Sequence, residues 1–401
     1  TAIGADVHDV VVVGKGLIGS AAFRHLAERG ADTLLIGPDE PVDTATHDGV
    51  FGAHYDEARL THLHGRSPVW AELCRRSIDR YPELEARSGI AFAEPIGELF
   101  VSDPGVASPY TAPENVRHSR EALGVDLVEL EAGAVRARFP SLALPDDGTV
   151  LWERRPAGYL NPRAMLRAEV ALGRDAGGRT HADIVIATAR RDGHMVVRTR
   201  SGAEFAAGHV LVASGAFANS YDQLPRPLAI RCKTEHVVFA RVSADGRRHL
   251  EGLPVMHYDL HDDVLANVYL VPPVRYPDGH HYLKLGANTA TDRFLTSTEE
   301  MQAWYRNGDS DRQLPAMRAL VQRLFPGLTV DGWHTGRCVI TRTPHQLPMI
   351  DTIEPGLSVA VGGNGSSAAC ADALGELAAE LVHRGGWHDE LAAEGFAAVS
   401  S

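Results

Sequence analysis

The sequence predicts an α/β fold in which a Rossmann-like dinucleotide-binding domain, built from discontinuous segments, joins an α+β domain with an antiparallel or mixed sheet. Three observations support this fold class: a glycine-rich βαβ pattern near the N-terminus, short apolar strands that recur late in the chain, and segments of alternating polarity between them. The length of 401 residues also favours two connected domains over one core.

The βαβ pattern comes first along the chain. Residues 8–13 are β-branched and apolar, as in a buried parallel strand. Residues 20–29 have a helical pattern that Gly30 ends, and residues 33–36 form the second strand. The motif therefore has the strand–turn–helix context that dinucleotide binding requires.

Three glycines in the first turn each have a physical role. Gly14 allows the tight turn, Gly16 lets a pyrophosphate approach the backbone, and Gly19 lets helix and strand pack closely. The N-terminus of the helix then offers free N–H groups and partial positive charge to the phosphates.

The acid that normally binds the ribose is missing from the end of the second strand. Gly37 occupies that position, and it has no side chain to bind a hydroxyl group. Asp39 and Glu40 follow in the loop, and the sequence leaves open which of them reaches the ribose.

The later segments indicate how the two domains alternate along the chain. Further strands are expected at residues 182–187, 196–199, 209–213 and 357–361. Residues 94–101 and 233–284 alternate in polarity, as antiparallel strands do. We expect residues 1–90, 150–225 and 330–401 to form the dinucleotide-binding domain. Residues 91–149 and 226–329 then form the second domain.

Composition excludes several functional classes. The formal charge of −13 disfavours nucleic acid as a partner. No apolar run approaches the roughly 20 residues that span a bilayer, and no signal-peptide pattern precedes the first strand, so we expect a cytoplasmic protein, monomeric or a small homo-oligomer. Its four cysteines lie far apart, which argues against a disulfide framework or a structural zinc site.

A metal site is not expected at the histidines either. His257 and His261 have i, i+4 spacing beside Asp262 and Asp263, but the surrounding pattern indicates loop and strand, where this spacing does not share a face. His54, His62 and His64 fall where the cofactor should bind, so one of them is a candidate substrate contact.

Two later glycine turns favour FAD over NAD. The strand at residues 210–213 leads into Gly215, and the strand ending at residue 361 leads into a turn and a small-residue helix at 366–384. The second turn consists of Gly362, Gly363, Asn364 and Gly365. A helix N-terminus there would stabilise the anionic reduced flavin. An NAD-dependent dehydrogenase remains the alternative.

Several short motifs resemble the monomeric sarcosine oxidase family of FAD-dependent amine oxidases, within the D-amino-acid oxidase superfamily. The motifs are DEARL at residues 56–60, ARFP at 137–140, GYLNP at 158–162, SGAFAN at 214–219 and CVITRTP at 338–344. The resemblance covers nearly the whole chain. It implies an oxidase that moves a hydride from a C–N bond to flavin N5 and passes the electrons to O₂, giving H₂O₂.

The resemblance also implies roles for three residues. Cys338 would carry the flavin covalently, and Arg337 and Arg342 beside it favour the reactive thiolate; the alternative is a buried structural cysteine. Lys284 would lie by flavin N5 and promote reaction with oxygen; the alternative is a lysine on a solvated strand face. Arg59 would lie against the flavin ring; the alternative is a surface arginine.

The substrate positions depart from the family pattern. The family holds a substrate carboxylate between an arginine and a lysine, but His62 and Ala369 occupy those positions here. Asn288 replaces a substrate-site histidine, whereas Tyr269 matches a substrate-site tyrosine. These changes predict a larger, uncharged or cyclic amine rather than sarcosine, such as a biosynthetic intermediate. Two alternatives remain: a dehydrogenase with a non-oxygen acceptor, and a catalytically idle FAD-binding protein.

Overall fold

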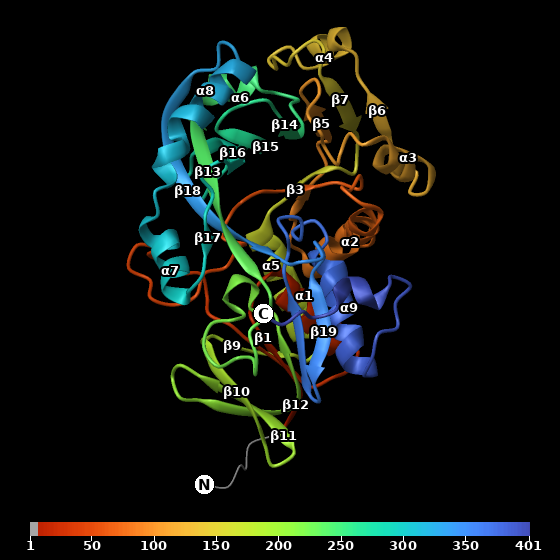
Figure 1. The fold of residues 1–401 in the computed structure, drawn as a ribbon, viewed down its shortest axis with the longest axis vertical. Coiled ribbons are helices and arrows are strands. Elements are labelled where there is room, and N and C mark those ends of the chain that lie inside the picture. Colours follow the sequence, from red (N-terminus) through yellow and green to blue (C-terminus); the bar gives the residue numbers. More distant parts are fainter. Residues whose placement is uncertain (1–6) are drawn as a thin grey trace.

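The computed structural model describes residues 7–401, which form two large sheets and one small sheet with helices around them (Figure 1). An eight-stranded sheet occupies the lower half of Figure 1, and a nine-stranded sheet occupies the upper half. No helix among the described residues is long and apolar enough to span a membrane.

The eight-stranded sheet forms the core of the lower half. Its strands are β1 (His8–Val13), β2 (Thr33–Ile36), β9 (Arg179–His181), β10 (Val185–Arg191), β11 (His194–Thr199), β12 (Glu204–Val212), β19 (Met349–Glu354) and β20 (Leu357–Val361). β1 pairs in parallel with β2 and β12, and β20 pairs in parallel with β12. The parallel centre confirms the predicted Rossmann-like arrangement.

Helices cover this parallel centre. The helices of the chain are α1 (Leu17–Glu28), α2 (Pro68–Ser88), α3 (Pro113–Glu121), α4 (Ala132–Arg138), α5 (Pro162–Asp175), α6 (Ala244–His249), α7 (Thr298–Asn307), α8 (Leu314–Leu324) and α9 (Ala371–Arg384). α1 packs against α5 and α9 through a shared apolar core. α1 begins three residues before the predicted helix, and α9 begins five residues after the predicted start at 366 because residues 366–370 form a turn.

The nine-stranded sheet forms the core of the upper half. Its strands are β5 (Glu98–Ser102), β6 (Leu127–Glu129), β7 (Thr149–Glu153), β13 (Arg231–Val242), β14 (Val255–Asp259), β15 (Leu265–Arg275), β16 (His281–Thr289), β17 (Phe294–Leu295) and β18 (Val330–Arg342). β14 pairs with β5 in parallel, whereas the other pairs are antiparallel. The mixed sheet agrees with the predicted fold class. Three short strands, β3 (Arg59–Thr61), β4 (Ala93–Glu94) and β8 (Gly158–Leu160), form the small sheet.

Strand pairing changes two of the predicted segment boundaries. β18 was expected in the dinucleotide-binding part, but it pairs along the length of β13 in the nine-stranded sheet. β7, which the predicted boundary at 150 divides, also pairs in that sheet. A strand belongs to the sheet whose neighbouring strands satisfy its backbone hydrogen bonds. β7 and β18 therefore belong to the nine-stranded sheet. The division into domains otherwise remains a prediction.

Candidate functional site

A cavity of about 520 Å³ lies between the two sheets. The carboxyl ends of β1, β2, β12 and β20 open into it, which is where ligands bind in open parallel sheets. β13, β14, β15 and β18 of the second sheet supply the facing wall. The cavity size is typical of small-molecule sites.

The first glycine turn forms a tight backbone cradle at one end of this cavity. Gly14 has a φ of 109°, and a Cβ added there would lie 2.5 Å from the Ala213 carbonyl oxygen. A Cβ on Gly19 would lie 1.9 Å from the Gly14 carbonyl oxygen. At Gly16, in contrast, no atom of the described chain lies within 4 Å of an added Cβ. A side chain is therefore excluded at Gly14 and Gly19 and has room at Gly16, where the approach of a pyrophosphate remains a prediction.

The N-terminus of α1 is open toward the same space. Within residues 7–401, no side chain caps α1 at Gly16, and its first turn carries no acidic residue. Leu17 and Ile18 line the cavity. The uncapped N–H groups and the helix dipole therefore favour an anionic group such as a pyrophosphate.

The structure explains why Gly37 replaces the ribose-binding acid. A Cβ at Gly37 would lie 2.5 Å from the Lys15 amide nitrogen, so this position has no room for a side chain. Asp39 forms an ion pair with Lys15, and Glu40 accepts a 2.7 Å hydrogen bond from Arg163. Both acids lie outside the cavity lining, whereas Asp183, which the sequence analysis did not identify, is part of it.

The two later glycine turns also line the cavity. Gly215 has a φ of 57° and lies at the end of β12. In the second turn, Gly362, Gly363, Asn364 and Gly365 follow β20. The buried Asn364 side chain accepts a hydrogen bond from the Thr343 amide (2.9 Å) and donates to the Gly362 carbonyl (2.7 Å). This network ties the turn between β20 and α9 to Thr343, which follows β18.

Lys284 is buried, so the solvated-lysine alternative is wrong. Its ammonium donates to the Asp56 carboxylate and to the Ala58 carbonyl (2.8 Å). Arg59, which lines the cavity, pairs with the same carboxylate. Burial and the adjacent Arg59 guanidinium lower the pKa of Lys284, while Asp56 holds the ammonium in place. Lys284 itself lies outside the cavity lining, with Nζ 5.1 Å from the ring centroid of Tyr269.

Tyr269 and Asn288 lie in the cavity wall on neighbouring strands. Tyr269 is opposite Gly286, and a Cβ on that glycine would lie 2.1 Å from the tyrosine ring. The missing side chain therefore makes the space that the Tyr269 ring fills. Asn288 donates through its amide to Asn267, which also lines the cavity.

Cys338 lies in the cavity wall on β18, directly opposite Glu235 of β13. The arginines expected to favour its thiolate are engaged elsewhere. Arg337 donates to the Gly308 carbonyl (2.7 Å), and Arg342 donates to the Asn364 carbonyl (3.2 Å). Glu235, a buried carboxylate, was not identified from the sequence.

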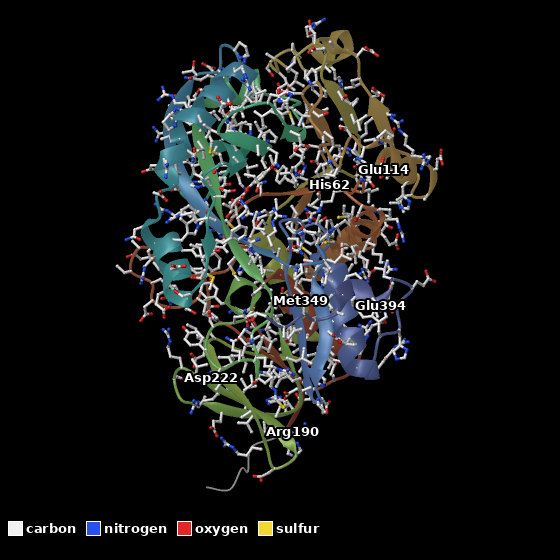
Figure 2. All side chains as sticks on the ribbon, in the orientation of Figure 1. His62, Glu114, Arg190, Asp222, Met349 and Glu394 are labelled. Carbon is white, nitrogen blue, oxygen red and sulfur yellow. The ribbon has the colours of Figure 1, made fainter. Side chains whose placement is uncertain are left out.

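The two residues at the expected carboxylate-clamp positions do not reach the cavity. Figure 2 shows His62 at the level where the two halves of the molecule meet. His62 is buried and bonds through Nδ1 to the His64 carbonyl. Ala369 is also buried, and its carbonyl accepts the Tyr81 hydroxyl (2.6 Å). Of the three histidines considered as substrate contacts, His54 lines the cavity.

A half-buried histidine in this wall pairs with a fully buried glutamate behind it. His257 lines the cavity, and its Nδ1 lies 2.6 Å from Glu98 Oε1. Glu98 Oε2 has no hydrogen-bond partner among the residues that the structure describes. Burial raises the pKa of Glu98 to about 8 and lowers that of His257 to about 4. Glu98 is therefore protonated at neutral pH, and the neutral His257 ring shares one hydrogen bond with its Oε1, whose direction follows the tautomer of the ring.

Two further residues, His62 and Glu153, lie beside the pair formed by His257 and Glu98. His62, Glu98 and His257 each have an atom that could bind a metal ion, and these three atoms lie within 4.8 Å of one another. This cluster differs from the histidine spacing considered in the sequence, since the His261 ring bonds to the Pro104 carbonyl instead (3.0 Å). Glu153, opposite Glu98 in the sheet, accepts the backbone amides of residues 63 and 64 at 2.8 and 2.9 Å.

The sequence signal for Glu98 and Glu235 was weak but present. Each is a lone carboxylate within a strand whose other residues are largely buried. Buried carboxylates are rare unless they are paired, so an acid inside an apolar strand marks a site to inspect. The pairing itself depended on residues far away in the sequence.

Comparison with curated proteins and solved structures places this geometry in a known context. The chain is 27% identical over 391 residues to monomeric sarcosine oxidase of Streptomyces avermitilis, and the alignment covers 94% of each chain. It is 24% identical over 382 residues to N-methyl-L-tryptophan oxidase of Citrobacter koseri, again covering 94% of each chain.

The structure of NikD, an amino acid oxidase of nikkomycin biosynthesis, superposes with a TM-score of 0.76 at 18% identity and covers 99% of this chain and 98% of NikD. L-Proline dehydrogenase from P. horikoshii superposes with a TM-score of 0.71 at 17% identity and covers 98% of this chain and 97% of that chain. These likenesses show the shared fold. Residues 9–381 match the family model described as "FAD dependent oxidoreductase". The chain therefore belongs to the DAO family of FAD-dependent oxidoreductases.

Proposed function

We propose that the protein is an FAD-dependent oxidase that removes a hydride from the carbon of a C–N bond in a small amine other than sarcosine. The electron acceptor is O₂, and the product formed from it is H₂O₂. A secondary or cyclic amine is the proposed substrate class. The observation that carries this proposal is the cavity, which joins both glycine turns to Tyr269 and Cys338 while His62 and Ala369 stay outside its lining. The relatives named sarcosine oxidase and N-methyl-L-tryptophan oxidase support an amine substrate.

The residues of the cavity fit FAD. Gly14 and Gly16 with the N-terminus of α1 would hold the pyrophosphate. Arg59 and the second glycine turn would border the flavin ring, and Cys338 would carry it covalently. Bound FAD supplies the two-electron acceptor that the amino-acid side chains lack.

The protein's own contribution is to position a neutral amine. Tyr269 and the His257 ring form part of a wall that excludes water, which favours the uncharged amine. His257 is neutral because burial lowers its pKa to about 4, so its ring can form a hydrogen bond with the neutral amine without adding a positive charge to the cavity. Glu98 supports the ring through Nδ1 and so fixes its orientation.

The absence of the predicted clamp argues against sarcosine. The two positions predicted for a carboxylate clamp hold His62 and Ala369, which lie outside the cavity lining, and Arg66 and Arg342 in the lining each donate a hydrogen bond to the Asn364 carbonyl at 3.2 Å. An amine that does not depend on a bidentate carboxylate contact therefore fits better.

The proposal is tested by anaerobic reduction of the protein-bound flavin. Sarcosine, N-methyl-L-tryptophan, glycine, L-proline and uncharged cyclic amines would be mixed with the purified flavoprotein, and bleaching of its visible absorbance would be followed. We expect an uncharged or cyclic amine to reduce the flavin fastest and to yield H₂O₂ in air. Fastest reduction by sarcosine would contradict the substrate class, and a preparation that binds no FAD would remove the whole proposal.

A dehydrogenase with a non-oxygen acceptor is the second candidate function. One observation favours it: Lys284, the residue expected to promote the oxygen reaction, is tied to Asp56 and lies outside the cavity lining. The two functions differ in the rate at which air reoxidises the reduced flavin. Fast reoxidation supports the oxidase, and slow reoxidation that a quinone accelerates supports the dehydrogenase.

A further inference from the structure

We propose that Glu235 is the base that removes a proton from the flavin 8-methyl group when Cys338 forms its bond to the flavin. This inference rests on the covalent attachment proposed above. It adds a second reaction at the far wall of the same cavity, separate from amine oxidation.

The register of two strands brings the two residues together. Glu235 on β13 is the direct antiparallel partner of Cys338 on β18. Directly opposite side chains in such a pair point to the same face, with Cβ atoms about 5 Å apart. Both residues line the cavity. A methyl carbon within bonding reach of the cysteine sulfur therefore lies beside the carboxylate.

The surroundings of Glu235 make it more basic than an exposed carboxylate. Burial raises its pKa, and the Lys233 ammonium, 2.9 Å from Oε2, opposes that shift. Lys233 also pairs with Asp292, so a single ammonium is shared by two carboxylates. Glu235 is 4% exposed, and water therefore competes weakly for its oxygens. A poorly solvated carboxylate of this kind is a stronger base than one at the surface.

Other acids in the cavity wall are less suitably placed. Among the residues that the structure describes, the lining contains three carboxylates: Asp183, Glu235 and Asp259. Asp183 precedes β10 in the eight-stranded sheet, and Asp259 ends β14 beside β5. Glu235 alone of these three is paired in register with Cys338.

The reaction balances with O₂ as the oxidant. Glu235 takes one proton from the 8-methyl group, the thiol of Cys338 gives up its proton, and its sulfur bonds to the methyl carbon. The electron pair left on the ring system passes to O₂, which takes up both protons and leaves as H₂O₂. The methyl group and the thiol thus become a thioether, with one H₂O₂ formed for each flavin attached.

The test follows attachment rather than amine oxidation. Apoprotein would be mixed with FAD in air, quenched with acid at intervals, and assayed for protein-bound flavin by gel fluorescence and intact mass, with H₂O₂ measured in parallel. We expect the wild type to gain one FAD and to release one H₂O₂. Glu235→Gln should bind FAD but attach it about 100-fold more slowly, as expected for loss of a general base. Acetate should partly restore attachment in Glu235→Ala, which a merely structural role would not allow.

Control variants make each outcome decisive. Asp259→Asn removes another cavity carboxylate and should attach FAD at the wild-type rate, while Cys338→Ala should attach none. If Glu235→Gln does not bind FAD, the Glu235→Asp variant is measured in its place. That variant should bind FAD with unchanged affinity but attach it slowly. Attachment at the wild-type rate in Glu235→Gln or Glu235→Asp would overturn the role of Glu235. A wild type that binds FAD but never attaches it would overturn this inference and the attachment at Cys338, while flavin reduction by an amine would still support the oxidase.

Discussion

Replacing the buried Glu98 by glutamine is expected to change how the stability of the protein depends on pH. In the folded protein the pKa of Glu98 is raised to about 8 from its usual value of 4.5 because the carboxyl group is buried. As pH rises above the unfolded value, the unfolded chain releases this proton while the folded chain retains it. Glu98 therefore stabilises the fold fully below about pH 4.5 and loses that contribution as pH rises toward 8.

The size of the effect follows from the pKa difference. Each pH unit between the two pKa values costs about 1.4 kcal/mol of stability per retained proton. Between pH 6.5 and 8 the loss from Glu98 is about 1.5 kcal/mol, since the folded group itself begins to ionise near the upper limit. The histidines beside it have pKa values lowered to about 4 from 6.5, so each gives an opposite contribution of about 0.4 kcal/mol above pH 6.5 that the wild type and a Glu98 variant share. The difference between the two proteins therefore isolates Glu98.

The assay is urea unfolding at several pH values across this window, with FAD held in large excess so that cofactor binding is constant. Glu98→Gln cannot ionise, so its stability should fall by about 1.5 kcal/mol less than that of the wild type between pH 6.5 and 8. Glu153, whose pKa is also about 8, should contribute to the remaining slope in the same direction, and the histidines should oppose it. Glu94→Gln, an exposed change on β4, serves as the control. Equal slopes in Glu98→Gln and the wild type would refute a protonated, buried Glu98.

Three further predictions test other parts of the cavity. Gly16→Ala should leave the stability of the apoprotein unchanged but weaken FAD binding, measured by fluorescence titration, whereas Gly14→Ala should destabilise both forms; equal effects would contradict the cradle. Gly286→Ala should cost about 1–3 kcal/mol by urea unfolding because its Cβ overlaps the Tyr269 ring, and Tyr269→Leu should relieve the cost. Lys284→Met should slow reoxidation of photoreduced flavin in air about 100-fold, by stopped-flow absorbance, if the enzyme is an oxidase; an unchanged rate would favour the dehydrogenase.

The local features of the fold could be predicted because their signals are contiguous. Residues 8–13 are apolar, followed at once by the glycine turn and a helix, and the structure has β1 and α1 there. β18 was less predictable because its partner, β13, lies far away in the sequence and sets which sheet it joins. A strand pattern indicates extended backbone but does not specify its neighbour.

The environments of the site residues were the hardest to predict. Lys284 alternates with apolar residues, which indicates a solvent-facing side chain, but Asp56, 228 residues away, supplies a buried partner. Glu98 and His257 are separated by 159 residues and meet because β5 and β14 pair in parallel. Which polar side chains are buried thus depends on partners that are distant in the sequence. The local sequence pattern around each residue does not reveal that partner.

Three carboxyl groups buried near the cavity differ in what neutralises them, and this difference separates their roles. Asp56 is paired with Lys284, and Glu235 shares Lys233 with Asp292, so protonating either acid would weaken an ion pair. The partner of Glu98 is the neutral ring of His257, so this pair can take up or release a proton without breaking an ion pair. The His257–Glu98 pair is therefore suited to a hydrogen bond with a neutral amine during turnover. Glu235, in contrast, would take up a proton once, when the cofactor is attached.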